Sequence, residues 1–327
     1  MSICLALVSH AALAQTVSTG RPDEGIFTFQ FENDIFGNTD QHFTPGTRMA
    51  WMSPEDSVPD RVKDAASWMP MFDAGASRRI VYSLAQSIYT PDDISLRTLQ
   101  PDDRPYAGWL HAGIGLVSVS GDRLDSLGLD LGIVGPHSYA EDVQKTWHEW
   151  FGFPRPNGWD NQLKDEPGLL LTYERKWRRW ARFGALGLDG DVTPHVGANL
   201  GNVLTQGAAG FTIRIGADLA RHYDYGPPRI RPSLPGSDFF ASDGGFGWYL
   251  FFGAEGRAVL RNIFLDGNTW RDSHSVDKEP FVGDIQGGLA VIVGPVRLAY
   301  THVFRTREFE SQDDTDQFGA FSVSLIF

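Results

Sequence analysis

Residues 126–133 read SLGLDLGI, and this stretch decides the fold class. Leucine or isoleucine stands at every second position, at 127, 129, 131 and 133, with serine, glycine or aspartate between them. Because side chains of a β-strand point alternately to opposite faces, the pattern predicts a strand with one wholly apolar face. Residues 80–85 and the final run FSVSLIF, 321–327, alternate in the same way.

Segments of this kind recur along the chain between turn signals, as they do in transmembrane β-barrels. A soluble β-sandwich would also alternate, but three features favour a closed antiparallel transmembrane β-barrel: 36 glycines, an aromatic last residue, and 22 Phe, 10 Trp and 9 Tyr, many near expected strand ends. We predict about twelve strands, at residues 25–35, 44–53, 78–89, 106–119, 122–134, 167–177, 184–198, 206–221, 246–262, 280–293, 296–307 and 317–327. The long connection 54–77 has room for a short helix.

The N-terminal segment has the pattern of an export signal. Residues 3–14, ICLALVSHAALA, are apolar and end in a small-x-small motif, so we expect a signal peptide at 1–14 and a single barrel domain at 15–327. A buried first helix is the alternative. The one cysteine, Cys4, falls inside this segment, so a metal in the mature protein would use oxygen or imidazole ligands. The net charge of -13 argues against nucleic acid as a partner.

An exported barrel belongs in the outer membrane of a Gram-negative bacterium. An even number of strands puts both chain ends in the periplasm, so connections after odd-numbered strands face the cell exterior. Asn33 and Asp34 at the end of the first strand, Thr44 at the start of the second and Arg97 after the third therefore gather at the exterior rim. Strand alternation places Asn33 on the lipid side and Asp34 on the lumen side, which would let a site open sideways to lipid.

The connection after the fifth strand carries a second polar cluster. In GPHSYAEDVQKTWHEWFG, 135–152, helical spacing gives one apolar face and an adjoining polar stripe of Glu141, Gln144 and His148. This helix could lie against the barrel wall, or it could be an amphipathic lid with a solvent-facing histidine. The oxygen donors nearby suit calcium, and a lone histidine beside them suits a general base better than a zinc site. No Gly-x-Ser-x-Gly motif of serine esterases is present.

The mature chain resembles the outer-membrane lipid A 3'-O-deacylases, which are calcium-dependent twelve-stranded barrels. Four marks carry the resemblance, each at its expected strand end: Asn33-Asp34, Phe43-Thr44-Pro45-Gly46, the run DRPYAGW at 103–109, and Gly135-Pro136 followed by Glu141, Gln144 and His148.

The resemblance implies hydrolysis of the 3'-acyloxyacyl ester of lipid A, with lipopolysaccharide as the substrate and Ca²⁺ as the cofactor. It also implies His148 as the base that deprotonates water, Asp34 as a calcium ligand, and Asn33 and Thr44 as polar groups of the catalytic centre. Gln144 and Arg97 are candidates for binding substrate, and we expect a monomer.

Pro154 departs from the family pattern, because some members have a carboxylate there that helps to bind metal. A second metal ligand would then come from Glu141 or from Glu149, Asp160 or Glu166. Two other functions stay open at this point: a barrel phospholipase, which would need a serine nucleophile, and a non-enzymatic porin, which would need a wide lumen. Large inward side chains such as Arg48 argue against a wide lumen.

Overall fold

The computed structural model describes residues 23–34, 45–55, 57–73, 75–217, 219, 222–230 and 233–327. The strands in these residues are β1 (Ile26–Asn33), β2 (Gly46–Met52), β3 (Ser77–Tyr89), β4 (Ala107–Ser120), β5 (Arg123–Val134), β6 (Glu166–Trp177), β7 (Ala181–Ala185), β8 (Leu188–Gly201), β9 (Leu204–Ala217), β10 (Tyr223–Asp224), β11 (Phe240–Ala241), β12 (Phe246–Asn262), β13 (Phe281–Val293), β14 (Val296–Arg305) and β15 (Asp316–Ile326).

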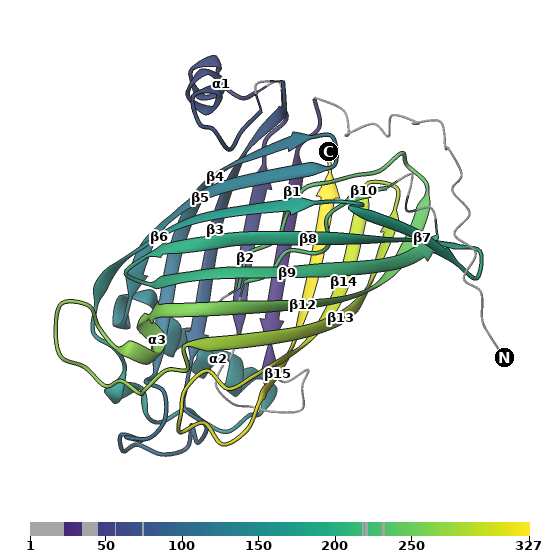
Figure 1. The fold of residues 1–327 in the computed structure, drawn as a ribbon. Coiled ribbons are helices and arrows are strands. Elements are labelled where there is room, and N and C mark those ends of the chain that lie inside the picture. Colours follow the sequence, from purple (N-terminus) through teal and green to yellow (C-terminus); the bar gives the residue numbers. More distant parts are fainter. Residues whose placement is uncertain are drawn as a thin grey trace.

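Twelve of the described strands form one closed antiparallel barrel (Figure 1). Each pairs with its neighbour in the order β6-β5-β4-β3-β2-β1-β15-β14-β13-β12-β9-β8. The ring closes where β6 pairs with β8, in register from Leu170 opposite Gly201 to Lys176 opposite His195. β7 extends β8 into a hairpin beyond the ring. The predicted barrel of about twelve strands is confirmed, and closure excludes the β-sandwich.

The alternation in the sequence is the alternation between the two faces of the wall. On β5, Leu131 is 54% exposed on the outer face, whereas Ser126 and Asp130 line a cavity in the lumen. The lumen also holds fully buried arginines, among them Arg214 and Arg297, each paired with an aspartate. The outer face is therefore apolar, whereas the interior holds charged and polar side chains beside apolar ones, unlike a soluble globular core.

Helices lie at both ends of the barrel. α2 (Ala140–Phe151) and α3 (Ile263–Asp266) lie at one end, called here the α2 end, and α1 (Asp60–Ser67) and the C-terminus lie at the opposite end (Figure 1). α1 is the short helix expected between residues 54 and 77. Within the described ranges, none of the helices has the length and apolar character needed to cross a membrane.

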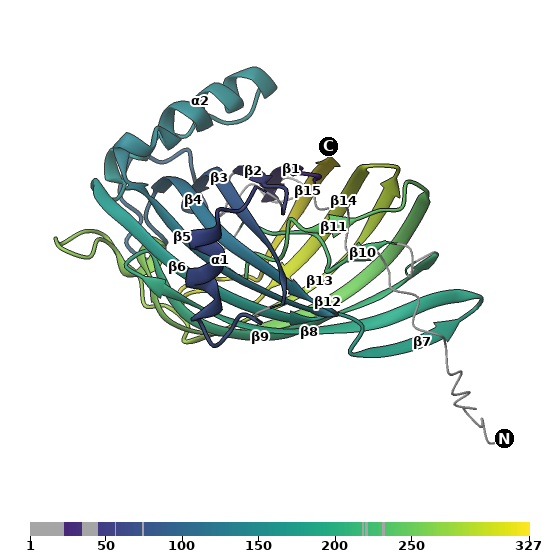
Figure 2. The same cartoon turned by 90° about the horizontal axis from the view of Figure 1, so that it is seen from above.

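A segment between β9 and β12 enters the lumen from the opposite end. It consists of residues 222–230 and 233–241, includes the two-stranded pair β10 and β11, and lies inside the ring of strands (Figure 2). We call these residues the plug. At the α2 end, a cluster of apolar residues that includes Trp109, Leu204 and Phe264 packs inside the barrel. The barrel is thus filled rather than open.

The strand boundaries differ from the predicted ones mainly around residues 181–221. A single strand was predicted at 184–198, whereas β7 and β8 form a hairpin there, with Leu186 in a left-handed conformation at its turn and Arg179 in another at the turn between β6 and β7. The next strand is β9, which ends at Ala217 rather than at residue 221. The plug and α3 were not predicted. Their regular elements are two to four residues long and show no usable periodicity.

Candidate active site

The helix α2 packs on the outer face of the barrel wall. Gln86 of β3 donates a hydrogen bond from Nε2 to the carbonyl oxygen of Ser138, at 2.6 Å, just before the helix begins. Farther along α2, the ring of Trp147 lies 5.4 Å from that of Phe31, an outward-facing residue of β1. Figure 2 shows α2 outside the ring of strands on this side. α2 therefore lies on the apolar outer face of the barrel and not on the lumen face.

Local backbone signals place the helix. Tyr139 and Gly152, the residues flanking α2, both have left-handed conformations, with φ of 57° and 72°. Gly108 of β4 makes the close approach possible, since a Cβ there would collide with the side chains of Ser138 and Ala140. A glycine at this position lets the helix start rest directly on the strand.

A small apolar cluster supports the same region from the neighbouring loops. It comprises Ile88, Ile94, Tyr106, Ala140 and Trp159. The Tyr106 hydroxyl donates to the carbonyl oxygen of Ile94 at 3.3 Å, and burial raises the pKa of this hydroxyl, which keeps it neutral. The cluster ties the start of α2 to the connection between β3 and β4.

The polar stripe of α2 faces the barrel. Gln144 and His148 are 0% and 1% exposed, whereas Trp150 is 75% exposed on the opposite side of the helix. The lid alternative, with a solvent-facing histidine, is therefore wrong. The exposed Trp150 and Phe151 fit a helix whose outer side meets an apolar medium.

His148 is held in one tautomer. Its Nδ1 lies 2.6 Å from the backbone carbonyl oxygen of Pro154, which can only accept a hydrogen bond, so Nδ1 carries the proton in the neutral ring. Nε2 then has a lone pair. It is buried and, within the described part of the chain, has no hydrogen-bond partner. Pro154 thus orients His148 through its backbone, whatever side chain stands at that position.

Gln144 lies one helical turn before His148 on the same face. Its Oε1 accepts a hydrogen bond from Trp159 Nε1 at 2.8 Å, which fixes the amide and leaves Nε2 as a donor. That Nε2 is buried and lacks a hydrogen-bond partner among the residues described. The buried side of α2 therefore carries a proton acceptor, His148 Nε2, and an oriented N–H donor, Gln144 Nε2, one helical turn apart.

Asn33 and Asp34 lie at the end of β1, and each is 1% exposed. Asn33 points outward from the same strand as Phe31, roughly 7 Å along it. Phe31 contacts Trp147, which precedes His148, so the end of β1 meets the C-terminal half of α2. Asn33 was predicted to face lipid. It is on the outer side, as expected, but it is buried at the end of the strand.

The other predicted residues have different surroundings. Thr44 lies outside the described residues. Arg97 is exposed in the connection after β3, and its carbonyl oxygen accepts a hydrogen bond from Asn161 Nδ2 at 2.8 Å. Glu141 forms an ion pair with Lys145, one turn along α2. Of the substitute carboxylates, Glu166 accepts hydrogen bonds from Asn202, Asn268 and Thr269.

The donors at the end of β1 fit a cation that prefers oxygen. A buried carboxylate, Asp34, stands next to the amide of Asn33, and the one cysteine of the sequence, Cys4, falls in the expected signal peptide, which lies outside the described residues. The described ranges contain no group of three or more His, Cys, Asp or Glu side chains that could enclose a metal. The carboxylate of Asp34 and the amide of Asn33 suit calcium, which accepts carboxylate, amide and water oxygens, better than zinc.

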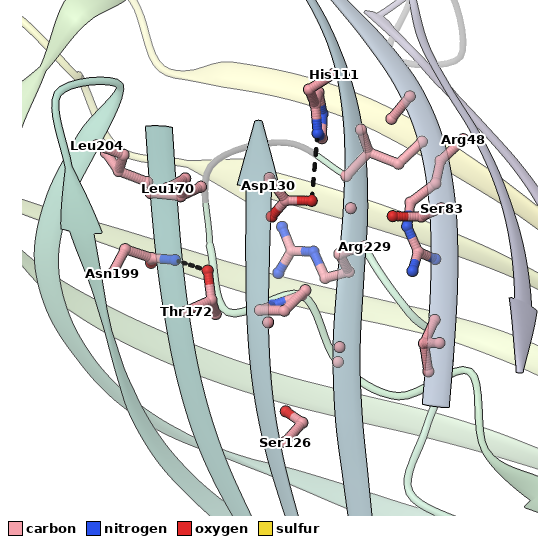
Figure 3. Close-up of a pocket in the computed structure, with 18 of the residues that line it drawn as sticks. Arg48, Ser83, His111, Ser126, Asp130, Leu170, Thr172, Asn199, Leu204 and Arg229 are labelled. Carbon is pink, nitrogen blue, oxygen red and sulfur yellow. Dashed lines mark hydrogen bonds and ion pairs between the residues drawn. The ribbon is translucent and has the colours of Figure 1, made fainter. Parts of the chain in front are cut away.

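A separate cavity of about 150 Å³ lies inside the lumen, between the wall and the plug (Figure 3). His111 and Asp130 line it and approach within 3.3 Å, and Arg48 and Arg229 also face it. The wall separates this cavity from α2, because His111 points to the lumen whereas Gly108 of the same strand contacts α2 on the outside.

Comparison with known proteins finds one family model and solved structures that are similar to this chain. The family model described as "Outer membrane protein LpxR" matches residues 1–327. The solved structure of LpxR from Salmonella typhimurium is similar, with a TM-score of 0.74 and 20% identity over 92% of this chain and 100% of that chain. The β-domain of the Bordetella autotransporter BrkA has a TM-score of 0.45 and 10% identity, over 93% of this chain and 99% of that chain. The search of curated proteins found no match.

Proposed function

The chain belongs to the LpxR family of outer-membrane proteins, and we propose that it hydrolyses the 3'-acyloxyacyl ester of lipid A in the outer leaflet of the outer membrane. The α2 end, with the candidate site, faces the cell exterior in this proposal. Lipopolysaccharide is then the substrate, and the protein acts as a monomer.

One observation carries the proposal: the buried His148 Nε2, which has a lone pair and no hydrogen-bond partner among the described residues, belongs to the helix that packs on the outer face of the wall. A substrate anchored in the membrane can reach the outer face without entering the barrel. A water-soluble substrate would not be concentrated at this apolar surface, beside the exposed Trp150 and Phe151. The site therefore suits a lipid ester.

The chemistry follows from the orientation of the groups. His148 takes a proton from water at Nε2 while Nδ1–H stays hydrogen-bonded to the Pro154 carbonyl, which stabilises the imidazolium that forms. The water oxygen attacks the ester carbonyl carbon. The Gln144 Nε2–H donates to the oxyanion, and the proton on His148 then passes to the leaving alkoxide as the ester bond breaks.

The remaining predicted residues hold the substrate and the cation. Asp34 and Glu141 are the proposed calcium ligands, and Asn33 and Thr44 supply polar contacts beside them. Calcium, when bound, supplies positive charge near the ester oxygen. Glu141 would have to exchange its ion pair with Lys145 for this role. Arg97 is exposed at the same end of the barrel and is the proposed contact for a phosphate group of lipid A.

Lipid analysis tests the proposal. Mass spectrometry of lipids from cells with and without the protein should show loss of one acyloxyacyl group from lipid A. A phospholipase would instead remove acyl chains from glycerophospholipids, and a porin would leave all lipids unchanged. Either of those two outcomes would refute the proposed function.

A further inference from the structure

The plug touches β1 on the lumen side directly behind the candidate site. The backbone N–H of Ile230, in the plug, donates to Glu32 Oε1 at 2.7 Å. Glu32 is 0% exposed, and the next two residues in the chain are Asn33 and Asp34. A buried carboxylate bonded to a backbone N–H is a strong and directional contact.

A second contact joins the plug to β1 through β2. Arg48 of β2 makes two hydrogen bonds to Asp238 of the plug, both of 2.8 Å, and one of 2.6 Å to Gln30 of β1. Figure 3 shows Arg48 and Arg229 facing the lumen cavity from the wall and from the plug, respectively. Gln30 and Glu32 are neighbours on the lumen face, so β1 is held at two successive inward positions, at Glu32 by the plug and at Gln30 by Arg48, which itself bonds to the plug.

The plug itself is fixed to the rest of the barrel. Arg229 pairs with Asp284 of β13 at 2.9 Å, and Asp224 pairs with Arg297 of β14 at 2.7 Å. The N–H of Gly236 donates to Glu174 of β6 at 3.1 Å. Because these contacts reach strands on several sides of the ring, the plug is a rigid support and not a loose loop.

The end of β1 is therefore held from both sides, by the plug inside and by Trp147 of α2 outside. We propose that Glu32 is a positioning residue that sets the place of Asn33 and Asp34 relative to His148, with Arg48 and Asp238 acting in the same way. This inference rests on the proposed function of that site. A displacement of about 1 Å at such a site can cost roughly a hundredfold in rate.

The test compares Glu32→Ala with Glu32→Gln in the full-length barrel. The amide oxygen of Gln can still accept from Ile230, whereas Ala removes the contact. We expect Glu32→Ala to lower kcat for lipid A by at least roughly tenfold with little change in KM. Amide hydrogen exchange of β1 residues 30–34, measured without substrate, should quicken by at least roughly tenfold. Glu32→Gln should restore both values to within about threefold of the wild type.

Asp191→Asn serves as the matched control. Asp191 is equally buried and pairs with Arg214, at 2.6 Å, on strands β8 and β9 away from β1. It should lower thermal stability and leave both kcat and β1 exchange unchanged. Should Glu32→Ala fail to fold, Asp238→Asn should show the same two changes more weakly.

Unchanged β1 exchange in the folded Glu32→Ala or Asp238→Asn variant would overturn the positioning role, whatever the activity. Equal effects of Asp191→Asn on β1 exchange would also overturn it, because the cause would then be general destabilisation. If the wild type releases no acyl group from lipid A, the proposed function fails, and the exchange measurement still decides whether the plug holds β1.

Discussion

The imidazole Nδ1 of His148 lies 2.6 Å from the backbone carbonyl oxygen of Pro154. This contact connects the last turn of α2 to the loop that follows it, and it leaves Nε2 as the proton acceptor. From sequence, proline at this position was a departure that removed a possible metal-binding carboxylate. In the structure the position supports the histidine through its main chain.

Pro154→Ala should therefore be well tolerated. The carbonyl remains, and the loss of proline's restricted backbone costs about 1 kcal/mol or less, so kcat for lipid A should fall by less than about fivefold. Steady-state kinetics on the purified barrel will check this. A loss of a hundredfold or more in a folded protein would show that the proline ring itself matters to the site.

Gly108→Ala should displace α2 from the wall. The added methyl group collides with Ser138 and Ala140, and overpacking of this kind costs about 1–3 kcal/mol, so activity should drop by roughly tenfold or more. The barrel should stay folded. An unheated sample of a folded barrel migrates differently from a heated sample in a denaturing gel, and the variant should show the same difference as the wild type.

Gly256→Ala is the matched control for that variant. Gly256 is on β12, and a Cβ there would meet nothing within 4 Å. The control should retain full activity. If both glycine variants lose activity alike, the close approach of α2 to β4 is not the cause.

Gln144→Leu should lower kcat by roughly a hundredfold, because it removes the donor proposed for the oxyanion. Trp159→Phe keeps the Gln144 amide and an aromatic ring in the apolar cluster, and it removes the bond that orients the amide, at a cost of about 1 kcal/mol, so its kcat should fall less than tenfold. Kinetics of the two variants at saturating substrate give the comparison. A larger loss for Trp159→Phe than for Gln144→Leu would refute the donor role.

Removal of calcium should abolish activity without unfolding the barrel. The strand ladder satisfies its own hydrogen bonds and needs no metal, whereas the proposed site does. Activity in excess chelator, with circular dichroism on the same sample, makes the measurement. Full turnover in chelator would exclude a calcium requirement.

The fold could be predicted because the two faces of a barrel wall meet different media, so apolar and polar residues alternate along each strand. Leu131 and Asp130 are adjacent in the chain and lie on opposite sides of the wall, and this period of two continues around the ring. The plug could not be predicted, since Arg229 and Asp238 are held by partners far away in sequence, Asp284 and Arg48.

The candidate site could be predicted only in part. Helical spacing put Gln144 and His148 on one stripe, but spacing does not say which side of a helix meets the wall. The side is set by contacts of Gly108, Gln86 and Phe31 with the helix region. These three residues belong to different strands, so their contacts with the helix can be identified only when the strand pairing is known. Nothing local to Glu32 indicated a partner in the plug.

A calcium titration of His148→Gln and Asp34→Asn tests the central claim most directly. The quantity measured is the rate of acyloxyacyl release from lipid A at each calcium concentration, with both variants folded in the same detergent. If His148 is the base, His148→Gln should lose at least roughly a hundredfold in kcat at every calcium concentration. Asp34→Asn, which loses a charged ligand and keeps the base, should need more calcium for half activity and be partly rescued by it. Rescue of His148→Gln by added calcium would contradict the account, because the histidine would then serve the metal and not the water.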